Sequence, residues 1–387
     1  MNIIFFNSHT FLTKEIINSL KKRLDHQSII VNIPQYPAAI QVNSIFEQLK
    51  NYLPGLVLII NDAGCDYNGV LIKKLIDCGC LIANWYHDYP FYEAIFQGRQ
   101  TFPSPARIDF VSEKSFLPEM VERGFNAHFL PLATDISFFH PSESVELTRD
   151  VAFVGNSSCG FLDSIMTEER VRELEKLLPL QVLIKKKYIA DPRFDIFHFL
   201  LENKRLWQGK TSLKDDELLF CIEWMIGYLY RRDFIKAIAS RYKTRFFCFG
   251  DPYWKNFLDP SLVSTEACYY TNLCDIYKST KVNINVNRIQ IRTSFTQRIF
   301  DCAASGAFII TEKRECNKQF FKTGGTGQEL VEFESIGQCT DLIDYYLVHE
   351  EERKTIAEAA YQNVTRYHTY DIRISQMLET CRKYWKL

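Results

Sequence analysis

Short apolar segments alternate with amphipathic segments through the first third of the chain. The apolar segments predict strands at residues 2–6, 28–33, 55–60, 81–85, 108–112 and 128–130. The segments between them repeat apolar residues at the helical period, which predicts helices at residues 13–23, 42–52, 67–78 and 117–123. Strands that alternate with helices of about ten residues indicate βα units and a parallel sheet with both faces covered.

The alternation of apolar and amphipathic segments is interrupted at residues 131–141, a plausible linker between domains, and then begins again. A strand is predicted at residues 150–154, residues 161–241 have an almost wholly helical pattern with at most a short strand at 181–184, and strands return from residues 244–249 onward. This indicates an N-terminal α/β domain (1–140) and a C-terminal α/β domain (150–370) that carries a helical insertion (161–241). Residues 371–387 are expected to form a C-terminal helix with one apolar face.

Composition narrows the class of protein. Hydrophobic residues make up 47% of the 387 residues, which is ample for two cores. The net charge of −1 gives no basis for nucleic-acid binding by bulk electrostatics. No apolar run approaches the roughly 20 residues of a transmembrane helix, and the N-terminus lacks a basic leader. Twelve cysteines without pairing rhythm or zinc-site spacing are expected to be free thiols in a cytoplasmic, metal-free protein.

Residues 281–310 contain a strand pattern, an arginine-rich loop and a helix pattern in succession. Apolar residues alternate with asparagines over residues 282–286, the period of two that a strand requires. Ser294-x-x-Gln297 has the form of a capping box, and Gly306 stands where a helix C-cap glycine would. The sequence therefore predicts a helix that begins at Ser294 and ends at Gly306.

Three arginines accompany this predicted helix start. A helix N-terminus offers unpaired N–H groups and a partial positive charge, so together with Arg288, Arg292 and Arg298 it suits a phosphate or diphosphate. The alternative is that these arginines lie on a solvated face or pair with Asp301 and Glu312.

Ligands of open α/β sheets bind at the carboxyl ends of the strands, and two such domains predict a cleft between their sheets. The loops that follow predicted strands are residues 7–10, 61–66, 86–90, 155–160, 250–254 and 287–293. Gly155 removes the Cβ obstacle, so that a diphosphate or an acceptor can approach the backbone at Asn156 and Ser157; the alternative is an ordinary βα turn. Asn287 opens the arginine-rich loop.

Several segments resemble the GT-B-fold glycosyltransferases, in particular the bacterial group 1 proteins that include the spore-maturation CgeB-like proteins. These segments are FVSEKSFLPEMVERGFNAHFLPLATDISFFHP (110–141), VAFVGNSS (151–158), RIFDCAASGAFIITE (298–312), GQELVEFES (327–335) and EERKTIAEAAYQNVTRYHTYDIR (351–373). The loop WYHDYP (85–90) is also similar to a segment in many of these proteins. These stretches are spread over both halves of the chain, and the resemblance that they carry extends over about two thirds of it, without explaining residues 161–241.

The resemblance implies two Rossmann-like, doubly wound domains that face a cleft, and a helix at residues 371–387 that returns to the N-terminal domain. The C-terminal domain would hold a UDP- or GDP-linked sugar, and protein groups rather than a metal or cofactor would hold its diphosphate. Asp301 stands where relatives carry a glutamate that is expected to bind the donor ribose, and the shorter side chain keeps both acceptor oxygens. Thr293 stands where retaining relatives carry a second glutamate, so the sequence leaves the stereochemistry open.

An inverting transfer needs a base for the acceptor. His87 and Asp88 follow a buried strand at its carboxyl end, and either is a candidate catalytic residue, with His9 after the first strand as a competitor. The alternative is that Asp88 caps the turn before Pro90 and that His87 packs among tyrosines.

The sequence thus predicts a metal-independent glycosyltransferase of the hexosyltransferase type with an unidentified acceptor. One alternative is a non-catalytic nucleotide-sugar-binding or scaffold protein. Another is a GT-B-fold epimerase, which would need a set of acid/base carboxylates in the cleft. Donor turnover separates the enzymes from the binding protein.

Overall fold

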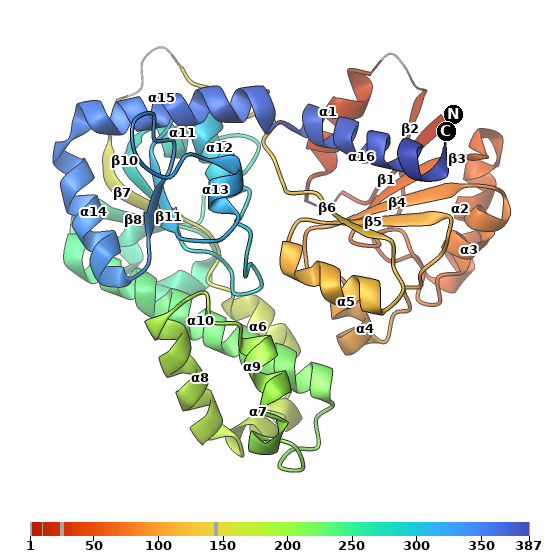
Figure 1. Ribbon diagram of the computed structural model, residues 1–387, viewed down its shortest axis with the longest axis horizontal. Helices are drawn as coiled ribbons and strands as arrows, with labels where there is room; N and C mark the ends of the chain where they lie inside the picture. The colour runs from red at the N-terminus through yellow and green to blue at the C-terminus, as the bar shows by residue number, and fades with distance from the viewer. Residues whose placement is uncertain (1, 10, 24–26, 143–145, 387) are drawn as a thin grey trace. The chain divides into compact units, whose positions relative to one another are not determined.

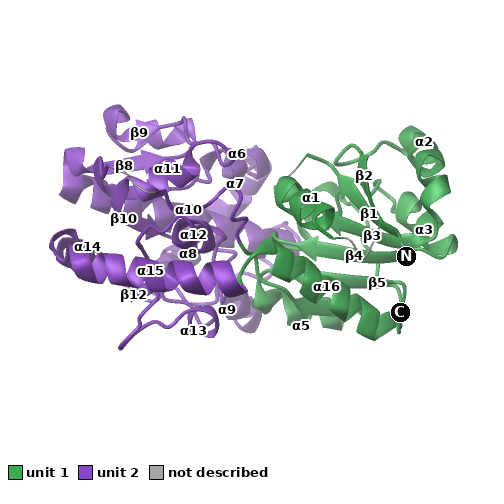
Figure 2. Cartoon of the chain, turned by 90° about the horizontal axis from the view of Figure 1, so that it is seen from above, with its two compact units in different colours: residues 1–133, 368–387 green, residues 134–367 purple. Residues whose placement is uncertain are grey.

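The structure, a computed structural model, describes residues 2–9, 11–23, 27–142 and 146–386. The chain divides into two compact units (Figures 1 and 2). Unit 1 comprises residues 1–133 and 368–387, and unit 2 comprises residues 134–367. Each unit is built on one six-stranded sheet in which every strand pair is parallel, which confirms the predicted α/β fold.

The sheet of unit 1 has the strand order β2-β1-β3-β4-β5-β6. Its strands are β1 (Asn2–Asn7), β2 (Ser28–Asn32), β3 (Gly55–Ile60), β4 (Leu81–Tyr86), β5 (Arg107–Val111) and β6 (Ala127–Phe129). Its helices are α1 (Thr13–Lys21), α2 (Ala39–Leu49), α3 (Val70–Asp77), α4 (Tyr92–Gln97), α5 (Leu117–Glu122) and α16 (Tyr370–Trp385). Because the strands are parallel, the loops after their carboxyl ends share one edge of the sheet.

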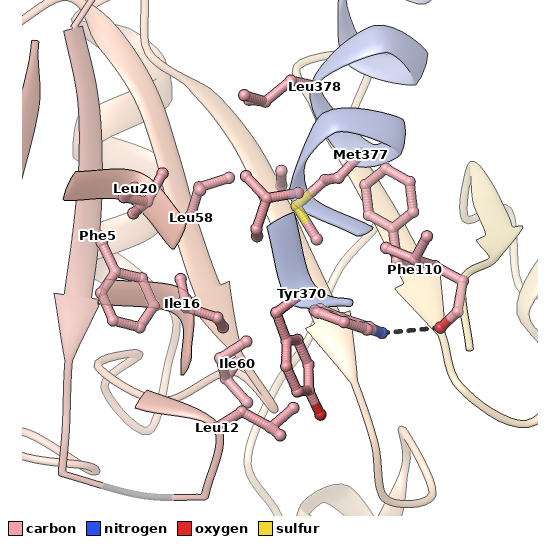
Figure 3. Close-up of a cluster of buried hydrophobic side chains, with 14 of the residues drawn as sticks. Phe5, Leu12, Ile16, Leu20, Leu58, Ile60, Phe110, Tyr370, Met377 and Leu378 are labelled. Carbon is pink, nitrogen blue, oxygen red and sulfur yellow. Dashed lines mark hydrogen bonds between the residues drawn. The ribbon is translucent and has the colours of Figure 1, made fainter. Parts of the chain in front are cut away.

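Alternate residues of the strands in unit 1 fill two separate cores. Phe5 points to the face that α1 and α16 cover, and Phe6 to the opposite face, which α2 and α3 cover. Figure 3 shows the first core, where Tyr370, Met377 and Leu378 of α16 pack beside the strands. A helix from the end of the chain therefore completes the fold of the N-terminal sheet.

A buried network of charged and polar groups connects β4 and β5 of unit 1 to the loop after β3. The Arg107 guanidinium donates to both oxygens of Asp109 (2.9 and 3.0 Å) and to Asp62 (2.8 Å). Tyr86 donates its hydroxyl to Asp62, and Asn84 donates to both carboxylates (3.2 and 3.3 Å). These bonds fix Asp62, which has a positive φ of 53°, in the loop after β3.

Unit 2 has the strand order β12-β11-β10-β7-β8-β9. Its strands are β7 (Arg149–Val154), β8 (Phe246–Phe249), β9 (Val263–Ser264), β10 (Thr280–Asn285), β11 (Ile309–Glu312) and β12 (Val331–Phe333). The helices outside the insertion are α11 (Leu273–Lys278), α12 (Arg298–Ala304), α13 (Asn317–Phe320), α14 (Ile336–Val348) and α15 (Glu350–Tyr367).

The connection from β7 to β8 is a helical insertion. It consists of α6 (Cys159–Ile165), α7 (Glu168–Glu175), α8 (Leu178–Ala190), α9 (Ile196–Glu202) and α10 (Asp215–Tyr242). The predicted short strand at 181–184 is wrong, because these residues lie inside α8. Pro179 stands in the first turn of this helix, where its missing N–H does no harm, and Ile184 is fully buried on its inner side.

The predicted helix start at Ser294 is also wrong. Helix α12 begins at Arg298 with Gln297 in the cap position, and residues 288–297 form a loop in which Ser294 is buried. The predicted end is confirmed: Gly306 follows α12 with a φ of +71°, and its N–H bonds to the carbonyl of Ala303.

Two further features concern the described residues alone. None of their helices is both long and apolar enough to cross a membrane. Nor do these residues place three or more His, Cys, Asp or Glu side chains together as metal ligands. All twelve cysteines are free.

The buried network of unit 1 generates a stability prediction. Arg107→Met should lower the free energy of unfolding by about 3–5 kcal/mol, because it leaves the carboxylate of Asp109 buried without its cation. Lys50→Met is the matched control, since Lys50 pairs with Glu47 in solvent and such pairs contribute about 0–1 kcal/mol. Urea unfolding of both variants measures the difference.

The loss of stability in Arg107→Met should depend on pH, and the pKa of Asp109 determines the sign of this dependence. Burial raises the pKa of Asp109 above its ordinary value of 3.8, so above that pH the folded state binds the proton more tightly than the unfolded state. Without Arg107, stability should therefore fall as pH rises from 3.8 toward the raised pKa. A loss in Arg107→Met that is independent of pH between about pH 4 and pH 7 would contradict this explanation.

Candidate functional site

Three arginines gather at the carboxyl edge of the sheet in unit 2. Arg231 comes from α10, Arg288 from the loop after β10 and Arg298 from the first residue of α12. Arg231 is buried and donates to the backbone carbonyls of Asn156 (3.1 Å) and Val286 (2.9 Å), which follow β7 and β10. We call these three residues the arginine cluster.

The backbone around the arginine cluster is tightly packed. A Cβ at Gly155 would lie 2.8 Å from a guanidinium nitrogen of Arg298, so a glycine is needed where the loop after β7 passes this side chain. Arg298 also donates to the side-chain oxygen of Asn285. A Cβ at Gly227 of α10 would lie 2.4 Å from the Cβ of Ile289, so the loop after β10 packs directly on the insertion.

The positive charge of the arginine cluster has no counter-charge bonded to it. Within the described part of the chain, none of the three arginines forms an ion pair or a hydrogen bond with a carboxylate, and Arg288 forms no side-chain hydrogen bond. Burial, and then the charges of Arg298 and Arg288, lower the pKa of Arg231 to about 9. Burial also lowers the pKa of Arg298, and Arg288 adds to this shift. The site therefore favours an anion that would offset the mutual repulsion.

Two buried polar atoms near the cluster also lack partners. Asn287 bonds through its N–H to Glu312 (2.7 Å) and accepts from Asn285 (2.9 Å), while its side-chain nitrogen has no hydrogen-bond partner. Asp251, in the loop after β8, accepts from the N–H (2.7 Å) and hydroxyl (3.0 Å) of Ser157, and its other oxygen is buried and unbonded. A ligand at this edge of the sheet would supply the hydrogen-bond partners that these two atoms lack.

Two of the predicted donor-site residues have other partners. Arg292 pairs with Glu223 of α10 (2.9 Å) and lies over the ring of Phe197 (4.6 Å), so it attaches the loop to the insertion. Asp301 is buried in α12, where its two oxygens accept from the hydroxyls of Thr134 (2.8 Å) and Tyr269 (3.0 Å). Ser294 is buried within the loop that precedes α12. Binding of a ribose by Asp301 would require these bonds to change.

In unit 1 the predicted pair His87 and Asp88 lies together at the end of β4. An imidazole nitrogen of His87 is 3.0 Å from Asp88 Oδ2, and Asn61 donates to the same carboxylate oxygen (3.0 Å). Asn61 also accepts from the N–H of His87 (2.9 Å). Asp88 is about half exposed (47%), whereas His87 is mostly covered (11%) and makes a T-shaped contact with the ring of Phe11.

His9 differs from this pair. It lies after β1 with a positive φ of 58°, and its N–H bonds to the side chain of Asn7 (3.1 Å). Its exposed side chain forms no hydrogen bond with residues that the structure describes. The structure therefore brings two of the three predicted catalytic residues together.

Sequence reasoning missed Arg231, Asp251 and Asn61. Arg231 lies in a helix with charges throughout its length, so no local pattern distinguishes it. A signal did exist for Asp251 and Asn61, because each follows a predicted strand and belongs to a candidate loop.

Comparisons with known proteins agree with the fold. Residues 231–379 match the model of a family described as glycosyl transferase-like. The crystal structure of a glycosyltransferase from Rickettsia africae ESF-5 is similar over 100% of this chain and 99% of its own, with 11% identity and a TM-score of 0.51. The Anabaena protein HepE (Alr3699), in complex with UDP, is similar over 99% of this chain and 100% of its own, with 9% identity and a TM-score of 0.50.

No curated protein sequence matches the chain. At identities of 9–11%, the structural likeness shows the fold. The chain therefore has the GT-B fold of these glycosyltransferases, with a segment at residues 231–379 that matches the glycosyl transferase-like family.

Proposed function

We propose that this protein is a glycosyltransferase that moves a sugar, of the hexosyl type, from a UDP-linked donor to an acceptor hydroxyl or other nucleophile. The observation that carries the proposal is the arginine cluster, which places three guanidinium groups at the carboxyl edge of the sheet without a bonded carboxylate. The UDP in the HepE structure supports a uridine donor. The quoted segments at residues 110–141 and 351–373 are the reason to place the protein near the CgeB-like group.

The arginine cluster accounts for the most demanding step of the reaction. Negative charge builds up on the leaving diphosphate as the bond to the sugar breaks, and fixed cations stabilise that charge. Arg288 and Arg298 would bind the phosphate oxygens. Arg231 would hold the loops after β7 and β10 in place and add its charge. The side-chain N–H₂ of Asn287 is a further donor for the nucleotide.

We place the acceptor and its base on unit 1, at the loops after β1, β3 and β4. Asp88 is exposed enough to meet a hydroxyl, and His87 lies beside it. The side chain of Asn61 orients both through the bonds described above. Either residue can take the proton: Asp88 directly, or His87 with Asp88 holding the imidazole. We also propose that the enzyme acts in the cytoplasm without a resident metal or cofactor.

The donor site is tested by comparing two neighbouring arginines. Arg288→Gln should weaken UDP binding by roughly 10-fold to 100-fold, the effect of losing a hydrogen bond to a charged group. It should leave the thermal midpoint of the unliganded protein unchanged or higher, because it removes a cation that has no bonded partner. Calorimetric titration with UDP and thermal unfolding measure the two effects.

Arg292→Gln is the matched control for Arg288→Gln. It should lower the thermal midpoint, because it leaves Glu223 buried without its cation, and it should reduce UDP affinity less. If Arg288→Gln binds UDP as tightly as the wild type, the arginine cluster is not the diphosphate site. Titration with GDP in parallel identifies the base.

The catalytic assignment is tested with Asp88→Asn. The amide oxygen can still accept from Asn61, so fold and UDP affinity should be preserved, while kcat for a UDP-sugar should fall by roughly 100-fold or more. Asp77→Asn, an exposed carboxylate on α3, is the control and should keep wild-type turnover. Hydrolysis and transfer across a panel of UDP-sugars provide the measurement.

Two results would count against the catalytic proposal. Wild-type turnover in Asp88→Asn would move the base to another residue. UDP binding by the wild type with no turnover of any donor in the panel would favour the alternative of a nucleotide-sugar-binding protein.

The proposed metal independence is tested by chelation. Because guanidinium groups supply the positive charge at the diphosphate, excess EDTA should leave turnover within about threefold of the untreated enzyme. Complete loss of turnover that Mn²⁺ or Mg²⁺ restores would show that a metal ion holds the diphosphate.

A further inference from the structure

Helix α8 of the insertion exposes an apolar surface. Leu178, Val182, Leu183 and Ile189 are 58%, 61%, 40% and 48% exposed. No other helix among the described residues exposes more than two large apolar side chains. In Figure 1, α8 lies at the outer side of the insertion, next to α9 and below α10. A concentration of exposed apolar side chains on one short helix indicates an interaction surface.

The exposed apolar residues of α8 lie on one side of the helix. Leu178, Val182 and Ile189 recur at the spacing of a helical stripe, and Lys186 belongs to the same stripe. The opposite side carries Leu180, Ile184 and Tyr188, which are buried. A helix that is apolar on all sides is normally buried all round, whereas α8 is buried on its inner side alone.

The charges of α8 indicate what covers its outer side. The helix contains three consecutive lysines and no acidic residue. Lys185 pairs with Asp233 of α10 (3.1 Å), while Lys186 and Lys187 form no ion pair within the described part of the chain. Lys187 lies near the rings of Phe194 and Phe199 (5.6 Å each). Two lysines without a carboxylate partner therefore accompany the apolar stripe.

Apolar side chains beside lysines that have no carboxylate partner are the combination that binds the surface of an anionic bilayer. The aliphatic groups enter the boundary between head groups and acyl chains, and the lysines contact the phosphates. A second copy of this chain is a poorer partner. A two-fold contact between two α8 helices would bring their lysines together, and α8 supplies no carboxylate to pair with them.

We propose that the outer side of α8 binds the surface of membranes that contain anionic lipids. The helix has 13 residues and would lie in the plane of the interface rather than cross the bilayer. This interaction is separate from the proposed transfer reaction, because no residue of α8 belongs to the arginine cluster or to the His87–Asp88 pair.

The test is co-sedimentation of the full chain with lipid vesicles. The wild type should sediment with phosphatidylcholine vesicles that contain about 30% phosphatidylglycerol, and should stay in solution with pure phosphatidylcholine. The double variant Val182→Asp/Ile189→Asp should lower the partition coefficient by roughly tenfold or more, since two apolar anchors become anions. Lys186→Glu/Lys187→Glu should lower it by a similar factor, and high salt should weaken wild-type binding.

Ile40→Asp is the matched control, because Ile40 is an exposed aliphatic residue on α2 of unit 1. It should bind vesicles like the wild type. All α8 variants should unfold at the thermal midpoint of the wild type, which shows that they are folded whatever the outcomes for lipid and for UDP.

Three outcomes would overturn the proposal. The first is wild-type protein that stays in solution with anionic vesicles. The second is undiminished binding by the α8 variants. The third is a dimer, seen by light scattering, that Val182→Asp dissociates while vesicles bind no protein; this outcome would assign the surface to a second copy of the chain.

Discussion

Arg231 donates hydrogen bonds to two loops that follow different strands of unit 2. The positions of these loops at the carboxyl edge of the sheet depend on its bonds. One guanidinium nitrogen holds the carbonyl of Asn156 after β7, and another holds that of Val286 after β10. The side chain comes from α10, so the insertion fixes the spacing of the loops that bound the arginine cluster. Removing the insertion would therefore remove part of the proposed donor site as well as a peripheral domain.

The two units use buried arginine in opposite ways. In unit 1, burial lowers the pKa of Arg107, but Asp109 and Asp62 outweigh this effect and hold the pKa above its ordinary value. In unit 2, burial and the neighbouring cations both lower the pKa of Arg231. A compensated charge connects strands and loops, whereas an uncompensated charge reduces stability until an anion arrives. This contrast is the physical reason for assigning Arg107 to the structure and the arginine cluster to a ligand.

Sequence patterns predicted the elements that bury continuous apolar runs. They failed where tertiary contacts determine the secondary structure. β3 has the predicted boundaries because all six of its residues are buried. Residues 181–184 have the composition of a strand. They are helical because the residues on either side of them in α8 are helical and because α8 packs on α10. Ser294 has the form of a helix cap, but the loop that contains it packs on the insertion, and α12 begins only at Arg298. The role of Arg231 depends on contacts 75 and 55 residues away in sequence, which no local pattern records.

The position of α16 also bears on how the chain is synthesised. Tyr370, Met377 and Leu378 belong to the core of unit 1, yet they follow all of unit 2 in sequence. A ribosome therefore releases the whole of unit 2 before α16 can join α1 on this face of the N-terminal sheet. Domains usually fold in the order of their synthesis, and here the order is reversed for the last step. Until then the nascent N-terminal sheet presents an apolar surface that a chaperone can bind.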